Sequence, residues 1–185
     1  GMVSIVIVAG NDAPHVKDAV ATALSQTYRN TEVIVCDDGS TDDTETQLEH
    51  CGGTITVIRQ VRRGLAAALN TAIQHSHGVY IAPLLAGEAF APDKIAKQVS
   101  RLAGQPDLNI IACGTDFVDE DPNHPAAEFE SALAAWGGSS GSEGLDRVPF
   151  SAVVFRRSLL DQVGWFEESD PESLSPTNPL ASLHH

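Results

Sequence analysis

The chain has 185 residues, with 11 Lys and Arg against 25 Asp and Glu, so its formal charge at neutral pH is −14. This acidic balance argues against nucleic acid or an anionic membrane surface as a partner, because both require basic side chains. A hydrophobic content of 42% indicates a globular chain, and no apolar run approaches the ~20 residues of a transmembrane segment.

Strand-like and helical patterns alternate along residues 3–113. Residues 3–9 form a continuous run rich in β-branched side chains, typical of a strand buried on both faces. Further strand-like runs fall at 31–37, 54–59, 79–85 and 108–113, and the helical segments between them at 16–24, 43–49, 64–76 and 92–104. The alternation predicts an α/β fold, a mainly parallel Rossmann-like sheet flanked by helices.

The pattern is weaker after residue 116. We expect a short helix over 128–136, a glycine- and serine-rich loop over 137–144, a strand over 148–155 and a helix over 157–163. Residues 169–185 contain three prolines and no period, which predicts an irregular or disordered tail. The chain should therefore form a single domain over 1–168, followed by this tail.

The three cysteines, Cys36, Cys51 and Cys113, are too widely spaced for a zinc site, and their odd number does not suit a disulfide framework. Free thiols favour a cytoplasmic location, and no signal peptide is expected.

Open α/β sheets bind ligands beyond the carboxyl ends of their strands, so the segments that follow the strands are the candidate sites. Several motifs occur there and in the adjoining helices: residues 25–30 (SQTYRN), 36–42 (CDDGSTD), 63–64 (RG), 70–73 (NTAI), 78–82 (GVYIA), 92–94 (PDK), 155–160 (FRRSLL) and 163–168 (VGWFEE). This ordered set, over about residues 3–168, resembles family 2 glycosyltransferases of the GT-A fold.

The resemblance implies a domain that binds a nucleotide-sugar donor of the UDP type, usually with a divalent metal. It assigns Asp37 and Asp38 to the base and ribose, which suits carboxylates because they accept hydrogen bonds from N–H and hydroxyl groups. An alternative is that Asp and Gly here only shape a turn, with Asp42 capping the next helix. The expected nucleotide-binding set is Ala9, Asn11, Asp37, Asp38, Gly39 and Arg63.

The sequence departs from the family where the metal would bind. The family carries Asp-x-Asp after the fourth strand, whereas this chain has Leu85-Ala86-Gly87-Glu88. Glu88 alone offers a carboxylate and is the candidate ligand for Mg²⁺ or Mn²⁺. Gly10 also stands where an aromatic ring commonly stacks on the base.

The chain also departs from the family where the catalytic base is expected. Only 17 residues follow Glu168, without the family's Glu-Asp motif, so Asp170 and Glu172 are the remaining candidates for that role.

Two hypotheses follow. The chain is either a glycosyltransferase acting on a glycan or lipid-linked cell-envelope acceptor, or a catalytically silent domain that binds a nucleotide, a glycan or a protein. The sequence specifies neither the donor sugar nor the acceptor, and it leaves open whether the chain forms a homo-oligomer.

Overall fold

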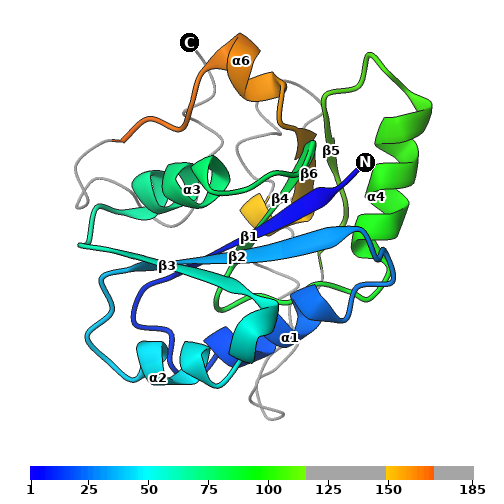
Figure 1. Cartoon of the computed structure of the whole chain (residues 1–185). Helices are drawn as coiled ribbons and strands as arrows, with labels where there is room; N and C mark the ends of the chain where they lie inside the picture. Colours follow the sequence, from blue (N-terminus) through cyan, green and yellow to red (C-terminus); the bar gives the residue numbers. More distant parts are fainter. Residues whose placement is uncertain (116–148, 169–185) are drawn as a thin grey trace, which may run out of the picture.

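Six strands lie side by side in the order β3-β2-β1-β4-β6-β5 in the computed structural model, which describes residues 1–115 and 149–168 (Figure 1). The strands are β1 (Val3–Ala9), β2 (Thr31–Asp38), β3 (Thr56–Gln60), β4 (Tyr80–Leu85), β5 (Ile110–Ala112) and β6 (Val153–Arg156). The first four pair in parallel, and β6 runs antiparallel to both β4 and β5. The predicted α/β fold with a mainly parallel sheet is confirmed.

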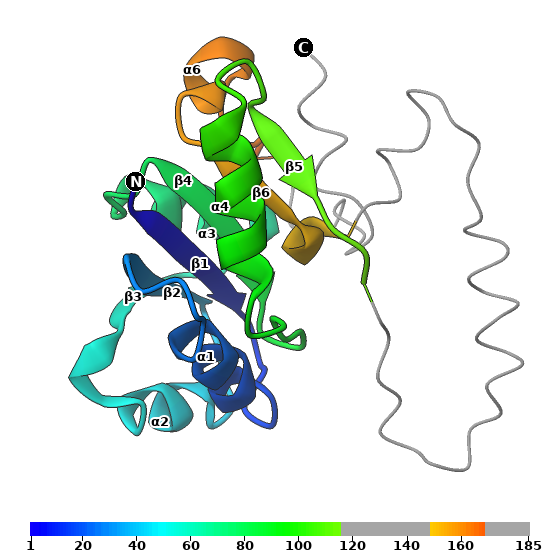
Figure 2. The same ribbon diagram turned by 90° about the vertical axis from the view of Figure 1, so that its right-hand side faces the viewer.

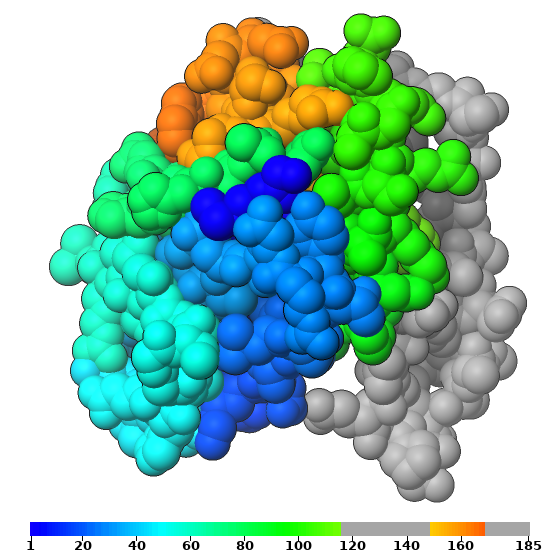
Figure 3. Space-filling view, turned by 45° about the vertical axis from the view of Figure 1, so that its right-hand side comes forward, coloured from blue at the N-terminus to red at the C-terminus, as the bar shows by residue number. Residues whose placement is uncertain are grey.

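Helices cover both faces of this sheet. They are α1 (Val16–Leu24), α2 (Thr44–Glu49), α3 (Leu65–Gln74), α4 (Lys94–Gly104) and α6 (Leu159–Val163), with short 3₁₀ turns η1 (Gly52–Thr54) and η3 (Phe150–Ala152). Figure 2 shows α1 and α4 on one face of the sheet. In the space-filling view, the N-terminal residues lie between the green segment that contains α4 and the cyan segment (Figure 3).

The core has two layers because β1 is buried on both faces, as its sequence predicts. Ile5 and Ile7 pack with residues of α1, α2 and α4, whereas Val6 and Val8 pack with residues of α3 and α6. Successive side chains of a strand point to opposite faces, so a continuous apolar run satisfies both layers.

The predicted strand over 148–155 is wrong in its first half. Residues 150–152 form η3, and the ladder begins only at Val153. Pro149 has no backbone N–H to give to a ladder, and its carbonyl accepts a hydrogen bond from Ala152 N at 2.8 Å.

Three other expectations for the second half of the chain cannot be compared with the structure. The helix over 128–136, the loop over 137–144 and the tail over 169–185 lie outside the described residues. Within the described ranges, the structure contains no helix with the length and apolar character needed to cross a bilayer.

Candidate functional site

The loops after β1 and β2 are bonded to each other at the carboxyl edge of the sheet. Asn11 Oδ1 accepts a hydrogen bond from Thr41 N at 2.8 Å, and Asn11 N donates to Ser40 Oγ at 3.0 Å. Asp12 N donates to Thr44 Oγ1 at 2.9 Å. Asn11 has a φ of 64°, a left-handed conformation that asparagine tolerates better than most residues. The two loops therefore form one polar unit with Asn11 at its exposed surface.

Asp37 shapes the turn that leaves β2. It is only 4% exposed, and its Oδ1 accepts a hydrogen bond from Ser40 N at 3.0 Å. The turn passes through Gly39, which has a φ of +69°, and a Cβ there would lie 2.7 Å from Arg62 N. Glycine is therefore required twice over, for its conformation and for the close approach of the β3–α3 loop.

Asp38 holds the β3–α3 loop against the end of β2. Its Oδ1 accepts hydrogen bonds from Gln60 Nε2 at 2.7 Å and Arg63 N at 2.9 Å, and its Oδ2 accepts one from Gly64 N at 2.8 Å. Gln60 is itself held by Thr71 Oγ1 at 2.7 Å. Asp38 thus has a structural role that sequence reasoning did not assign, and Gln60 was missed because no motif marks it.

The Arg63 guanidinium pairs with a carboxylate from far along the chain. Its Nη2 lies 2.5 Å from Glu168 Oε2, and the two side chains are 49% and 40% exposed. Asn70 Nδ2 also donates to Glu168 Oε1 at 3.1 Å and to the Phe166 carbonyl at 2.8 Å. Phe166 N returns a hydrogen bond to Asn70 Oδ1 at 3.2 Å. Asn70 therefore fixes the 166–168 segment on α3, and that segment brings Glu168 to Arg63.

The structure brings the six predicted nucleotide-binding residues together and sets Glu88 apart from them. Ala9 is the ladder partner of Asp37, and the contacts above connect the others. Glu88 follows β4, on the opposite side of β1, where Ala86 N donates to the Val8 carbonyl at 3.1 Å.

Glu88 is tied into the protein rather than open to solvent. Its Oε2 accepts hydrogen bonds from Ser151 Oγ and, at 3.3 Å, from Leu85 N. Burial raises the pKa of Glu88, while the Leu85 hydrogen bond and the Lys94 charge oppose that rise.

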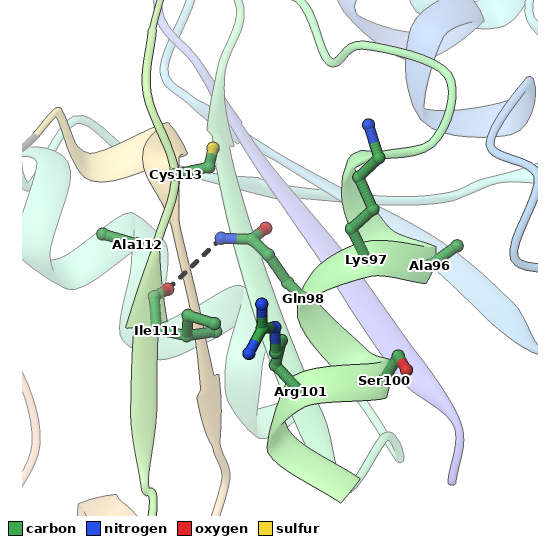
Figure 4. Close-up of a pocket in the computed structure, with 8 residues that line it drawn as sticks. All are labelled: Ala96, Lys97, Gln98, Ser100, Arg101, Ile111, Ala112 and Cys113. Carbon is green, nitrogen blue, oxygen red and sulfur yellow. Dashed lines mark hydrogen bonds between the residues drawn. The ribbon is translucent and has the colours of Figure 1, made fainter. Parts of the chain in front are cut away.

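Two surface hollows lie away from the predicted site residues. One, of about 590 Å³, runs between α4 and β5 and is lined by Ala96, Lys97, Gln98, Ser100, Arg101, Ile111, Ala112 and Cys113 (Figure 4). The other, of about 410 Å³, is lined by residues of α2, η1 and β3. Neither is lined by a predicted site residue.

Comparison with known proteins identifies the family. Residues 4–164 match the sequence profile of Glycosyl transferase family 2. The chain belongs to this family. An uncharacterized glycosyltransferase of Rickettsia prowazekii is 35% identical over 120 residues, which cover 64% of this chain and 38% of that protein. The Escherichia coli UDP-Glc:α-D-GlcNAc-diphosphoundecaprenol β-1,3-glucosyltransferase is 38% identical over 100 residues, covering 53% of this chain and 40% of that protein.

Solved structures show the same fold. A mannosyltransferase from Pyrobaculum calidifontis, in complex with GDP-Man and Mn²⁺, has a TM-score of 0.69 and 23% identity, with coverage of 96% of this chain and 49% of that one. S. aureus TarS 1–349 in complex with UDP-GlcNAc has a TM-score of 0.73 and 14% identity, with coverage of 98% and 52%. The GT-A fold expected from the sequence is confirmed. The chain spans about two fifths of the curated relatives named above and about half of these structures.

A divalent metal has a poor donor set in this family 2 chain. Leu85 and Gly87 offer no side-chain oxygen, and the Glu88 carboxylate already accepts two hydrogen bonds and faces the charge of Lys94. Within residues 1–115 and 149–168, no three His, Cys, Asp or Glu side chains gather in a way that could hold a metal ion. Mg²⁺ and Mn²⁺ at phosphate sites are commonly held by one or two carboxylates together with water and substrate phosphates. Among the described residues, this position offers only the Glu88 carboxylate, which is already bonded to Ser151 and Leu85, so these residues fit such an ion poorly.

Proposed function

We propose that this chain is the donor-binding part of a glycosyltransferase that uses a UDP-type nucleotide sugar in the cytoplasm. The acceptor would be a glycan or a lipid-linked cell-envelope precursor. The observation that carries the proposal is the bonded set of loops after β1, β2 and β3. It gathers the residues expected to bind nucleotide: Ala9, Asn11, Asp37, Asp38, Gly39 and Arg63.

The chemistry of these groups suits a nucleotide. Asp37 uses one oxygen for its own turn, and a carboxylate oxygen can accept more than one hydrogen bond, so acceptor capacity remains for a base N–H or a ribose hydroxyl. Arg63 provides a half-exposed guanidinium beside this edge, suited to charge-assisted bonds with an anionic donor.

The transfer would proceed with inversion. A carboxylate takes the proton of the acceptor hydroxyl, whose oxygen forms a bond to the anomeric carbon. The bond from that carbon to the diphosphate oxygen breaks, and the nucleoside diphosphate leaves with the electron pair. Asp170 and Glu172, the candidate bases, lie outside the described residues, and no step of this proposal passes through a metal.

A silent binding domain is the second candidate, favoured by two observations. Leu85 and Gly87 lack the two carboxylates of the family's Asp-x-Asp, and the Arg63 guanidinium is already paired with Glu168. Such a domain would bind a nucleotide, a glycan or a protein without transferring sugar.

Calorimetric titration with UDP and GDP, followed by incubation with UDP-sugars, tests both functions. We expect UDP to bind more tightly than ~100 μM, or about −5.5 kcal/mol. Arg63→Met should weaken binding about tenfold, whereas Arg101→Met, an exposed arginine on α4, should leave it unchanged. Absence of binding to either nucleotide contradicts the proposal. Binding with no release of sugar in the presence of acceptor extracts favours the silent domain.

A further inference from the structure

The Arg63 guanidinium is held by a carboxylate that is itself fixed in place. Glu168 uses both of its oxygens: Oε2 lies 2.5 Å from Arg63 Nη2, and Oε1 accepts a hydrogen bond from Asn70 Nδ2 at 3.1 Å. Two donors from different parts of the fold, the β3–α3 loop and α3 itself, therefore converge on one carboxylate. Such an arrangement is an anion site, because hydrogen bonds to a charged acceptor are stronger than those between neutral groups.

The segment that carries Glu168 is anchored on α3. Phe166 is 2% exposed, and its ring packs edge-on against Phe150, with 5.6 Å between the ring centroids. The backbone N–H and carbonyl of Phe166 both bond the side-chain amide of Asn70, which is 5% exposed. Losing Asn70 would leave these buried backbone groups without their partner. The anchored segment keeps Glu168 beside Arg63, although the Glu168 side chain is itself 40% exposed.

Arg63 is fixed independently of Glu168. Its backbone N–H donates to Asp38 Oδ1 at 2.9 Å, so the β3–α3 loop keeps the residue in place when the side chain changes partner. In the described part of the chain, the ion-pair partner of the guanidinium is Glu168. A second anion that approaches Arg63 meets the negative charge of Glu168 at short range, and like charges repel. Glu168 and an anionic ligand therefore compete for this guanidinium.

We propose that Glu168 is an internal competitor of the anionic donor for Arg63, and that Asn70 is the positioning residue that sets this competition. The inference rests on the proposed nucleotide-sugar function, in which Arg63 binds the donor. Glu168 holds the guanidinium before the donor arrives, and the donor replaces it. Asn70 keeps the 166–168 segment on α3, so that Glu168 returns to Arg63 as the nucleotide leaves.

The exposure of the ion pair sets the size of the expected effect. The Arg63 and Glu168 side chains are 49% and 40% exposed, so water and salt screen the attraction between them. Competition by Glu168 should therefore weaken nucleotide binding by a few-fold, not by orders of magnitude. A fixed geometry gives an exposed pair more weight than a freely moving one, and the Asn70 contacts supply that geometry.

The experiment is calorimetric titration of the full chain with UDP. Glu168→Gln removes the charge but keeps an oxygen that accepts from Asn70, and UDP should bind about threefold more tightly. In an Arg63→Met background, where no guanidinium is left to compete for, the same substitution should change the affinity by less than about 1.5-fold. Glu167→Gln removes the charge of an exposed neighbour and is the matched control, with the affinity of the wild type.

Asn70→Ala separates the positioning role from a purely structural one. It removes the hydrogen bonds to Phe166 and Glu168, so it should lower the melting temperature and tighten UDP binding about as much as Glu168→Gln does. In a Glu168→Gln background it should still lower the melting temperature but leave the UDP affinity unchanged, because no charged carboxylate remains to be positioned. Gln74→Ala, at an exposed position of the same helix, should alter neither quantity. If Asn70→Ala does not fold, the Glu168→Gln and Arg63→Met comparison decides by itself.

Three results overturn the inference while the proposed function stands. They are unchanged or weaker UDP binding in Glu168→Gln, an equal gain in affinity when Arg63 is absent, and an effect of Asn70→Ala on affinity that persists without the Glu168 charge. In each of them the wild type still binds UDP. Absence of UDP binding in the wild type and in every variant overturns the inference together with the proposed function.

Discussion

The two halves of the carboxyl edge use their carboxylates differently. At the end of β2, Asp37 and Asp38 accept hydrogen bonds from backbone N–H groups and so fix the loops after β2 and β3, which would meet the nucleotide. After β4, Glu88 accepts hydrogen bonds from the Ser151 hydroxyl and from Leu85 N, and burial raises its pKa against the opposing effect of the Lys94 charge. The first arrangement fixes two loops to the end of β2, whereas the second joins the loop after β4 to η3. The difference sets a closely bonded β2 end, where we propose that the nucleotide binds, against a β4 end that lacks the two carboxylates expected from the family at Leu85 and Gly87.

The largest expected effect is on the scaffold side. Asp38→Ala removes the acceptor of three hydrogen bonds and leaves the N–H groups of Arg63 and Gly64 without that partner. We expect a loss of about 3 kcal/mol in the free energy of unfolding, measured by urea denaturation. Glu88→Ala should cost less, because Glu88 is less buried and serves fewer donors. A loss of under about 1 kcal/mol for Asp38→Ala contradicts the anchoring role.

Glycine substitutions probe the same contrast. Gly39→Ala places a Cβ 2.7 Å from a backbone nitrogen at a φ of +69°, and we expect it to cost about 2 kcal/mol. Gly87→Ala, after β4, has open space around its Cβ position and is the matched control, with a change near zero. Equal melting temperatures for the two variants would contradict the prediction that the turn after β2 requires glycine at position 39.

The pH dependence of stability tests the burial of the Lys94 ammonium at the start of α4. The pKa of Lys94 falls from 10.5 to about 8 in the folded protein, so between these values the unfolded chain binds more protons than the folded one. This group therefore makes stability increase as the pH rises from about 8 to about 10.5. Lys94→Met should lack that contribution, visible as a difference between the two curves of unfolding free energy against pH. Parallel curves contradict the burial of a charged Lys94.

The smallest stability effect is expected at the exposed ion pair. Glu168→Gln breaks the pair with Arg63, and because both side chains are 40% exposed or more, the loss should be under about 0.5 kcal/mol. The same variant frees Arg63 and should tighten UDP binding by a few-fold. Glu167→Gln changes an exposed neighbour and is the control for net charge. Weaker UDP binding in Glu168→Gln alone indicates that Glu168 orients Arg63 instead of competing for it.

The main fold and most of the edge where we propose that the nucleotide binds follow from local sequence. Residues 3–9 predict a doubly buried strand because an unbroken β-branched run suits both faces of a sheet, and Asp37 to Gly39 predict a turn because of their side-chain chemistry. The antiparallel arrangement of β6 could not be derived in this way, because its neighbours are set by packing with distant segments. Gln60 was missed for the same reason, whereas Asn70 and Glu168 lie in motifs noted from the sequence but had no role assigned, because their partners are distant along the chain.

The sequence alone determined the family, the alternation of strands and helices, and the loss of side-chain oxygens at Leu85 and Gly87. These are properties of residue type and spacing. Only the tertiary structure decided that Asp38 anchors a loop, that Glu168 reaches Arg63, and that Lys94 is buried around the segment that holds Glu88. Each of these contacts except that of Asp38 with its loop joins residues more than 50 positions apart, and hydrogen bonds and charges act over ångströms in space, whatever the separation along the chain.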